Sequence, residues 1–407
     1  MIKVVHISTS NKGGAGIAAF RLHKALNKTN EIDSYFIQKD ESKNNLSDKV
    51  FHVSHFKPDI CFRVMKKFGL IDYVENQPVR LDVFKNYLNF EIATFPETSY
   101  KIEEHPLIKK ADIIHLHWVA GFLNYPSFFK KIKKPIVWTL HDMNPFQGLF
   151  HYKNDELQNE SSLGNINRKV LQSKERFINK NNNIKIITLC KWMNDISEES
   201  KALRKYKHQI IPNLIDFDHY PLLNRQLEKK KLNVDNGLKT LMFIAENIKN
   251  KRKGLDLLLE ALNGVQESVN IITVGGEKVI LNSNFNHLHF DIIDNMTQLN
   301  SIYSAADLVL ITSREDNLPN VMLEAFANGT PVLSFKTGGM KDWIIENETG
   351  ILVEPFSTFD LTNKIKLFLS NNYNFSNEKI HLYAKNNFSI ENKLSDYINL
   401  YKLKINK

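Results

Sequence analysis

The chain has little cysteine and no long apolar run. Its 407 residues include only two cysteines, Cys61 and Cys190, which are far apart in the sequence and predict no disulfide framework. No Cys-x-x-Cys pair is present to hold zinc. No apolar stretch approaches the roughly 20 residues that cross a bilayer, and the opening MIKVVHISTS lacks the pattern of a signal peptide. We therefore expect a cytoplasmic protein in a reducing compartment.

Features typical of nucleic-acid binding are also lacking. The chain has 54 Lys and Arg against 45 Asp and Glu, a formal net charge of +9, and lysines gather at 130–134, 229–231 and 249–253. No aromatic residues interleave with these runs and no zinc-finger spacing occurs, so we expect no nucleic-acid partner. For the cluster at 130–134, a solvated surface and a weak peripheral contact with the anionic inner face of a membrane both remain open.

Length and hydrophobic content indicate two globular domains. The composition is 42% hydrophobic and 24% charged, and 407 residues exceed what one hydrophobic core usually organises. Short apolar, β-branched runs alternate with helical patterns in both halves. The runs that predict strands are 2–8, 111–118, 135–141, 184–189, 239–245, 269–275, 306–312 and 330–335.

The order of these runs predicts an α/β fold of two doubly wound domains. Strands this continuously apolar are typical of parallel sheets covered on both faces. We place the domains at 1–213 and 214–385 and expect 386–407 to form a helix that packs back on the first domain. The predicted helices between strands are 16–28, 254–265, 297–306 and 319–329. No clear period appears over 38–105 and 153–183.

A glycine-rich turn follows the first predicted strand. In SNKGGAGIAAF, Gly13, Gly14 and Gly16 precede a helical pattern. Backbone amides and the helix dipole at such a turn could meet an anion. The pattern is neither G-x-G-x-x-G nor a P-loop, so a tight turn explains it as well as a phosphate does. The apolar positions at helical spacing that follow are Ile17, Phe20 and Ala25.

A second anion-binding candidate precedes the predicted helix 254–265. Arg252 and Lys253 stand directly before Gly254. Cations are unfavourable at a helix N-terminus, so their presence there calls for a compensating anion. A lysine point charge and the planar fork of an arginine both suit a diphosphate. A solvated basic loop is the alternative.

The stretch SREDNLPNVMLEAFANGTPVLS, residues 313–334, is the most informative. Asp316 and Glu324 lie eight positions apart, at the end of a predicted strand and on the following helix. In open parallel sheets, ligands bind beyond the carboxyl ends of the strands. A carboxylate among apolar neighbours needs donors, which sugar or ribose hydroxyls supply. Alternatively, Glu324 caps a neighbouring turn. The backbone amides of 316–320 are suited to a diphosphate or a hexose.

Two groups resemble metal ligands without forming a convincing set. Asp216 and Asp218 have the D-x-D spacing of metal-dependent transferases, but they lie in the presumed connection between domains. His115 and His117 share one side of a strand. With no third ligand nearby we expect core or cleft-edge histidines and not a zinc site. We therefore predict no metal site.

Taken in order, these motifs resemble those of the retaining GT-B glycosyltransferases of family four. The likeness covers 1–30, about 110–150 and 184–355, and is greatest for the branch that serves bacterial surface-polysaccharide assembly. It implies two Rossmann-like domains facing across a cleft. The motifs that carry it are the glycine-rich loop, TLHD, IPN-x-ID, RKG-x-x-x-L-x-x-AL and S-x-E-D-N-x-P-N-x-x-x-E-A-x-x-x-G-T-P-V.

The resemblance also implies a reaction. A hexose would pass from a nucleoside-diphosphate sugar to a hydroxyl of a growing glycan of a capsule, O-antigen or exopolysaccharide, free or lipid-linked. Anomeric configuration would be retained. Neither a metal nor a cofactor beyond the sugar donor would be required. No protein nucleophile would take part, because the leaving diphosphate would accept the proton of the incoming hydroxyl.

Site residues follow from the same resemblance. Asp316 would lie by the donor sugar and Glu324 would bind the ribose hydroxyls. Arg252 and Lys253 would hold the diphosphate. His141, in TLHD, would stand near the donor sugar and the reacting centre. The remaining donor-binding residues that it implies are Gly13, Gly14, Gly16, Asn317, Leu318 and Asn320.

The chain departs from the family pattern at three places. Asp316 stands where the family usually has Glu, and Asn247 stands where many relatives carry a phosphate-binding arginine. A cysteine-bearing insert found in relatives is missing between 148 and 183. A GT-B sugar-nucleotide epimerase and a non-catalytic nucleotide-sugar-binding protein therefore remain alternatives. A nicotinamide dehydrogenase is disfavoured because the glycine-rich loop lacks the dinucleotide fingerprint.

Overall fold

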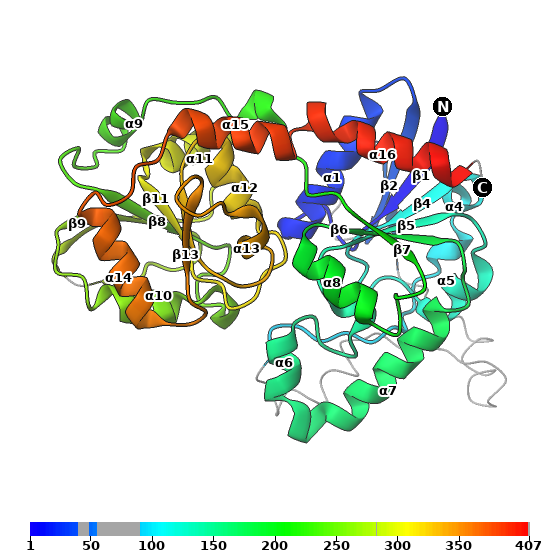
Figure 1. The fold of residues 1–407 in the computed structure, drawn as a ribbon. Helices are drawn as coiled ribbons and strands as arrows, with labels where there is room; N and C mark the ends of the chain where they lie inside the picture. Colours follow the sequence, from blue (N-terminus) through cyan, green and yellow to red (C-terminus); the bar gives the residue numbers. More distant parts are fainter. Residues whose placement is uncertain (40–48, 55–89, 282, 406–407) are drawn as a thin grey trace. The chain divides into compact units, whose positions relative to one another are not determined.

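A computed structural model describes residues 1–39, 49–54, 90–281 and 283–405 of the chain. The chain divides into two compact units. The first unit comprises Met1–Ile211 with Leu394–Lys407, and the second comprises Pro212–Lys393. Each unit is built around one parallel sheet, of seven strands in the first and six in the second (Figure 1). No helix in the described part of the chain is long and apolar enough to span a bilayer.

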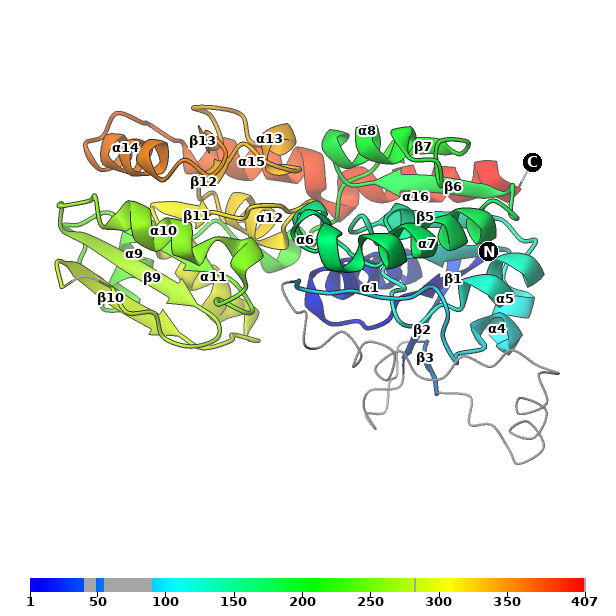
Figure 2. The ribbon, with the colours of Figure 1, turned by 90° about the horizontal axis from the view of Figure 1, so that it is seen from below.

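The strands of the first unit have the order β3-β2-β1-β4-β5-β6-β7, which can be followed in Figure 2. The chain runs outward from β1 through β2 and β3, then returns to the other side of β1 with β4. This reversal between β1 and β4 is a topological switch point, where open α/β sheets place ligands at the carboxyl ends of the strands. The strands are β1 (Ile2–Ile7), β2 (Ile32–Lys39), β3 (Val50–Val53), β4 (Ile113–Leu116), β5 (Ile136–Leu140), β6 (Ile184–Thr188) and β7 (Lys207–Ile210).

The C-terminal helix α16 (Ile390–Ile405) ends in the first unit and runs along its strands (Figure 1). Tyr397 and Tyr401 are buried, and the Tyr401 hydroxyl lies 2.7 Å from Nδ1 of His115 on β4. The other helices of this unit are α1 (Gly13–Asn27), η2 (Ile102–Glu104), α4 (Pro106–Lys110), α5 (Tyr125–Lys131), η3 (Asn144–Phe146), α6 (Lys153–Gln158), α7 (Glu160–Ile178) and α8 (Lys191–Glu199).

The second unit repeats the doubly wound scheme, with the strand order β10-β9-β8-β11-β12-β13. Its switch point lies between β8 and β11. Leu241 and Phe243 on β8, Leu310 on β11 and Leu333 on β12 belong to one buried core. The strands are β8 (Thr240–Ile244), β9 (Val269–Val274), β10 (Phe285–Phe290), β11 (Leu308–Ile311), β12 (Val332–Phe335) and β13 (Gly350–Val353).

One helix of the second unit was not predicted, because its residues form a charged run without an apolar pattern. Residues 225–231, RQLEKKK, form α9, in which Glu228 and Lys229 are buried. Lys229 Nζ lies 2.6 Å from Oδ2 of Asp307, just before β11, so the pair satisfies itself inside the fold. The helices are η4 (Phe217–His219), α9 (Arg225–Lys231), η5 (Lys251–Lys253), α10 (Leu255–Leu262), α11 (Met296–Ala305), α12 (Asn320–Ala327), α13 (Met340–Trp343), α14 (Thr358–Leu369) and α15 (Asn377–Phe388).

The two doubly wound parallel sheets confirm the predicted fold class, and all eight predicted strands are present. One detail of the predicted helix 16–28 is wrong. Helix α1 begins at Gly13, three residues before the predicted start, and of the apolar positions noted at helical spacing Ala25 is buried whereas Ile17 is 43% exposed. The buried residues of the helix also include Ala18, Leu22 and Leu26. Cys61 lies outside the described residues, and Cys190 is buried, with its Sγ accepting from the Met193 amide at 3.4 Å.

Candidate active site

The cations Arg252 and Lys253 lie in η5, in a loop that is fixed to the end of β11. The Thr312 hydroxyl donates to the carbonyl oxygens of Lys253 (3.1 Å) and Gly254 (2.9 Å), and the Arg314 amide donates to the Arg252 carbonyl (2.7 Å). Gly254 has φ +70°, and a Cβ there would lie 1.9 Å from the Thr312 carbonyl oxygen. Only glycine allows this approach, so the glycine places the two cations.

Arg314 holds the same loop from the other side, a role that the sequence did not indicate. Its guanidinium donates to both carboxylate oxygens of Asp256 at 2.8 and 2.6 Å. Asp256 lies in the first turn of α10. The hydrogen bond from Arg314 is the main cause that lowers the pKa of Asp256 below its usual value. This planar two-point pair fixes the start of α10 beside the cationic loop.

Asp316 receives both cations on one oxygen. Lys253 Nζ lies 2.7 Å and Arg252 Nη1 lies 3.1 Å from Asp316 Oδ2. Burial raises the pKa of Asp316, but the charges of Lys253 and Arg252 outweigh it, so that the pKa lies below its ordinary value. The compensating anion that we expected beside Arg252 and Lys253 is therefore the carboxylate of Asp316. Asp316 Oδ1 also accepts from the Asn317 amide at 3.1 Å.

The loop after β12 closes the third side of this site. The Gly339 amide donates to the Asp316 carbonyl at 3.1 Å. Gly338 has φ +51°, and a Cβ there would lie 1.9 Å from the same carbonyl oxygen. Loops that follow β8, β11 and β12 thus meet at Asp316, at the carboxyl edge of the second sheet. This is where a doubly wound sheet binds ligands.

Glu324 lies on α12 and is half-buried. Its Oε2 accepts from the Tyr303 hydroxyl at 3.0 Å, a contact between α11 and α12 that the sequence did not indicate. Burial and the neighbouring carboxylate raise the pKa of Tyr303 well above its ordinary value, so the phenol stays a donor. Asn317 and Leu318 are buried between the two acids, and Asn320 opens α12.

In the first unit, turn geometry accounts for two of the three predicted glycines. Gly13 has φ +66°, and a Cβ on Gly16 would lie 2.4 Å from the Ser10 carbonyl oxygen. Gly14 is exposed at the start of α1. The glycines therefore allow the turn from β1 into α1, and their predicted contact with a diphosphate remains a prediction.

His141 directly follows β5, and burial lowers its pKa to about 4, so it is neutral at pH 7. The adjacent Asp142 is fully engaged. Its Oδ2 lies 2.6 Å from both His151 Nδ1 and Trp118 Nε1, and its Oδ1 accepts from the Asn144 amide at 3.0 Å. Asp142 thus shapes the loop after β5, and the predicted role of the neighbouring His141 remains a prediction.

The expectation that His115 and His117 have no third ligand nearby is wrong. Strand β1 pairs with β4 and sets His6 opposite His115, so nitrogen atoms of the three rings lie within 4.8 Å of one another. The rings of His115 and His117 nevertheless stack, with centroids 4.1 Å apart. Both nitrogens of His115 already contact Tyr401 and Thr139. Because both nitrogens of His115 are already engaged and the three side chains are buried, we assign no metal ion to this group.

The D-x-D pair acquires a third acid in the structure. Carboxylate oxygens of Asp216, Asp218 and Glu391 lie within 4.8 Å of one another in the second unit. Asp218 and Glu391 are exposed, and Asp216 caps η4 by accepting from the Asp218 amide at 3.3 Å. An exposed acidic group with a capping role is common without an ion, so we assign no metal here.

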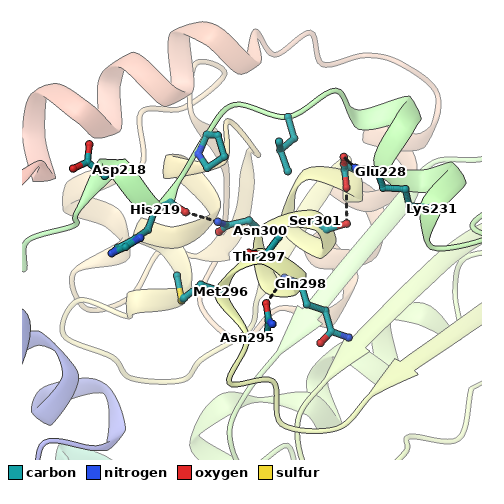
Figure 3. A pocket seen from close by; sticks show the side chains of 12 residues that line it. Asp218, His219, Glu228, Lys231, Asn295, Met296, Thr297, Gln298, Asn300 and Ser301 are labelled. Carbon is teal, nitrogen blue, oxygen red and sulfur yellow. Dashed lines mark hydrogen bonds and ion pairs between the residues drawn. The ribbon is translucent and has the colours of Figure 1, made fainter.

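A hollow of about 620 Å³ lies between η4, α9 and the start of α11 (Figure 3). The predicted site residues do not line it. Figure 3 shows that its polar groups bond to one another: Asn300 donates to the His219 carbonyl, and the Ser301 hydroxyl donates to Glu228 at 2.6 Å. The hollow is therefore a gap between packed helices and is separate from the site that contains Asp316.

Comparison with known proteins defines the class. Residues 224–387, which carry the cationic loop and both acids, match the family of glycosyl transferases group 1. The chain is 24% identical over 317 residues to an uncharacterised glycosyltransferase of Methanocaldococcus jannaschii, a match over 74% of this chain and 85% of that protein. The protein is a glycosyltransferase, and its residues 224–387 are similar to group 1 of these enzymes.

Solved structures place its fold. The chain is similar to sucrose-phosphate synthase from Thermosynechococcus elongatus, with a TM-score of 0.71, 16% identity and 99% of each chain covered. It is also similar to Anabaena HepE in complex with UDP-glucose, with a TM-score of 0.60, 17% identity, and coverage of 99% of this chain and 100% of that one. The two sheets are thus those of the GT-B fold.

Proposed function

We propose that the enzyme transfers a hexose from a nucleoside-diphosphate sugar to a hydroxyl of a growing surface glycan, with retention of configuration. The observation that carries this proposal is the convergence of Arg252 and Lys253 on Asp316 Oδ2. Two half-buried cations against one carboxylate leave one positive charge at the carboxyl edge of the second sheet. A similar fold has been solved with UDP-glucose, which supports this class of donor.

The ion pairs suggest how the donor enters. A diphosphate offers more negative charge and more acceptor oxygens than one carboxylate, so it competes with Asp316 for Lys253 and Arg252. Once released, Asp316 can accept hydrogen bonds from the hexose hydroxyls. Glu324, held by Tyr303, accepts from the ribose, while Asn317, Leu318 and Asn320 shape the loop around the diphosphate.

The chemical step then needs no protein nucleophile. The bond between the sugar carbon and the diphosphate oxygen breaks, the acceptor oxygen bonds to that carbon on the same face, and its proton passes to the leaving diphosphate. Lys253 and Arg252 stabilise the charge that develops there, the role that a metal has in other transferases. As a further part of the proposal, neutral His141 acts at the sugar and Gly13, Gly14 and Gly16 approach the diphosphate.

The acceptor is proposed to be a glycan carried on a membrane lipid. The support is the lysine cluster 130–134 at the end of α5. Lys131 pairs with Glu104 at 2.9 Å and Lys134 donates to a backbone carbonyl, while Lys130 and Lys133 are exposed. Exposed lysines attract an anionic membrane surface.

The test is a thermal-shift panel of UDP-, GDP-, ADP- and dTDP-sugars, followed by assays of the stabilising donor with and without glycan acceptors. We expect one nucleotide series to stabilise the protein, slow donor hydrolysis without acceptor, and transfer unaffected by EDTA. Stabilisation by no nucleotide sugar would overturn the proposal. An epimerised donor without acceptor would identify an epimerase, and tight binding without hydrolysis would identify a binding protein. Loss of activity in EDTA with recovery in manganese would contradict metal independence.

A further inference from the structure

Three histidines form a hydrogen-bonded row at the carboxyl edge of the first sheet. His6 lies on β1, His117 directly follows β4 and His141 directly follows β5, and these strands are neighbours in the sheet. His6 Nδ1 lies 2.9 Å from His117 Nε2, and His117 Nδ1 lies 3.3 Å from His141 Nε2. The proposed function uses only the last of these rings.

The row has a single direction because its members are neutral. Burial lowers the pKa of His6 and His117 well below the ordinary value, and that of His141 to about 4. A neutral imidazole carries one N–H, and its other nitrogen accepts. His117 uses both nitrogens in the row, so it donates through one and accepts through the other. Both hydrogen bonds therefore run the same way, either toward His141 or away from it.

The far end of the row decides the direction. His6 Nε2 is buried and has no hydrogen-bond partner among the described residues. If His141 donated to His117 and His117 donated to His6, then His6 would carry its proton on Nε2, and this N–H would be buried without an acceptor. If His6 donates to His117 and His117 donates to His141, the proton of His6 is on Nδ1, and His117 Nε2 accepts this hydrogen bond. Buried N–H groups without acceptors are rarer in proteins than unpaired acceptors.

We infer that His6 and His117 are positioning residues that hold His141 in the tautomer with its proton on Nδ1. His141 Nε2 then accepts from His117 and is closed to other protons. This inference rests on the proposed function for its consequence: His141 donates an N–H to a sugar or acceptor oxygen and cannot take the proton of the incoming hydroxyl. The leaving diphosphate is left as the base.

Two nearby histidines lie outside the row and serve as references. His115 stacks on His117 but contacts Thr139 and Tyr401. His23 packs edge-on to His6 with ring centroids 6.0 Å apart, and its Nδ1 lies 2.8 Å from the Ser34 hydroxyl. A variant at His23 therefore perturbs the same buried region without breaking the row.

The tautomer is measured by long-range proton–nitrogen NMR on the full chain labelled with ¹⁵N-histidine. The signals of His141 are assigned by their loss in His141→Asn. We expect a protonated Nδ1 and an unprotonated Nε2 at pH 7.5 in the wild-type protein. A protonated Nε2, or an even mixture of the two forms, would overturn the inference. This readout does not depend on any sugar donor, so it stands even if no transfer is found.

The row is tested further at its far end. His6→Leu removes the first donor, so we expect His141 to shift toward the Nε2–H form and kcat to fall about tenfold with KM for the donor nearly unchanged. His6→Asn can again donate to His117 and should restore both. His23→Asn should change neither. An unchanged His141 spectrum in His6→Leu contradicts the positioning role. If His6→Leu does not fold, the wild-type and His6→Asn spectra still decide the tautomer.

Discussion

At the scale of single residues, Asp316 has different partners before and after donor binding in our proposal. In the structure its carboxylate contacts both Lys253 and Arg252 and neutralises one of their two positive charges, which keeps both cations in place at the sheet edge. A bound diphosphate would take over that neutralisation. Asp316 and Glu324 are therefore expected to respond differently to substitution, although both are acids of one motif.

Glu324→Ala is expected to weaken the binding of nucleoside diphosphate and of sugar donor alike. A charge-assisted hydrogen bond contributes about 1.5–3 kcal/mol, which corresponds to roughly tenfold to a hundredfold in affinity.

Asp316→Ala should bind nucleoside diphosphate at least as well as the wild-type protein, because Lys253 and Arg252 lose the carboxylate that competes with the diphosphate. The same variant should transfer sugar more slowly. Calorimetry and turnover measure both effects, with Glu267→Ala, an exposed acid of the same unit, as control. The reverse pattern would exchange the roles of the two acids.

Lys253→Ala should weaken diphosphate binding and slow transfer together. It should also raise the pKa of Asp316, because burial raises that pKa and Lys253 is the largest opposing cause. Carboxyl ¹³C titration of Asp316 in the ligand-free protein measures this, with the exposed Lys278→Ala as the matched control. An Asp316 pKa that does not move would show that the ion pair does not persist in solution.

At the scale of elements, each site residue depends on a loop held by contacts from distant segments. Gly254 lets η5 touch β11, Gly338 lets the loop after β12 touch Asp316, and Lys174 on α7 holds the loop after β5. Their effects are on loop placement and on stability more than on direct binding.

Gly254→Ala is expected to destabilise the second unit by more than about 2 kcal/mol and to abolish diphosphate binding, because a positive φ and a backbone clash add together. A Cβ on Gly254 would lie 1.9 Å from the Thr312 carbonyl oxygen. The control is Gly237→Ala, since Gly237 has no positive φ and its nearest contact would be the Asp235 side chain at 3.3 Å. Urea unfolding compares the variants; equal stabilities would refute the role of Gly254.

Lys174 predicts a pH dependence of the first unit. It is buried, and Nζ donates to the carbonyls of Asn144 (2.7 Å) and Gly148 (2.6 Å). Burial lowers its pKa to about 7, whereas in the unfolded chain it is about 10.4. Between these values the unfolded state binds more protons, so the free energy of unfolding rises with pH.

Lys174→Met removes that titration while keeping the length of the side chain. We expect its free energy of unfolding to rise less steeply than that of wild type between about pH 7 and pH 10, and the two profiles to run parallel below about pH 7. Lys169→Met, on the exposed part of the same helix, is the control. Parallel profiles across the whole range would mean that Lys174 titrates normally.

At the scale of the whole molecule, the net charge of +9 is spread unevenly, and only part of the cluster 130–134 is available to a partner. Lys131 and Lys134 hold contacts within the first unit. Charge reversal at those two lysines would damage the fold as well as any membrane contact. The informative change is therefore confined to the exposed Lys130 and Lys133.

Lys130→Glu with Lys133→Glu is expected to reduce binding to anionic vesicles by at least tenfold, since each lysine near the surface contributes about 1 kcal/mol. Binding of the wild type should be weak and reversed by salt. Vesicle sedimentation measures it, with Lys278→Glu and Lys341→Glu in the second unit as the control. Equal binding of both double variants would leave the cluster as a solvated surface.

The strands that were not predicted lie at or beside the edges of the two sheets. The edge strands β3, β7, β10 and β13, together with β2 beside one edge, were all missed. A strand at a sheet edge is open to solvent on one side and need not be continuously apolar; β7, for instance, is mostly exposed. The eight predicted strands all lie inside the two sheets, where continuous apolar runs are buried on both faces.

The sequence alone determined the doubly wound class and the positions of Arg252, Lys253, Asp316 and Glu324 at strand ends and helix starts. Both depend on local patterns, namely apolar runs and residues adjacent to them along the chain. Only the tertiary structure decided what these side chains contact. The Asp316 ion pairs, the Tyr303–Glu324 bond, the burial of Lys229 and the row from His6 to His141 join segments far apart in sequence. Which distant groups meet depends on sheet register and strand order, and these are set by the packing of the whole unit.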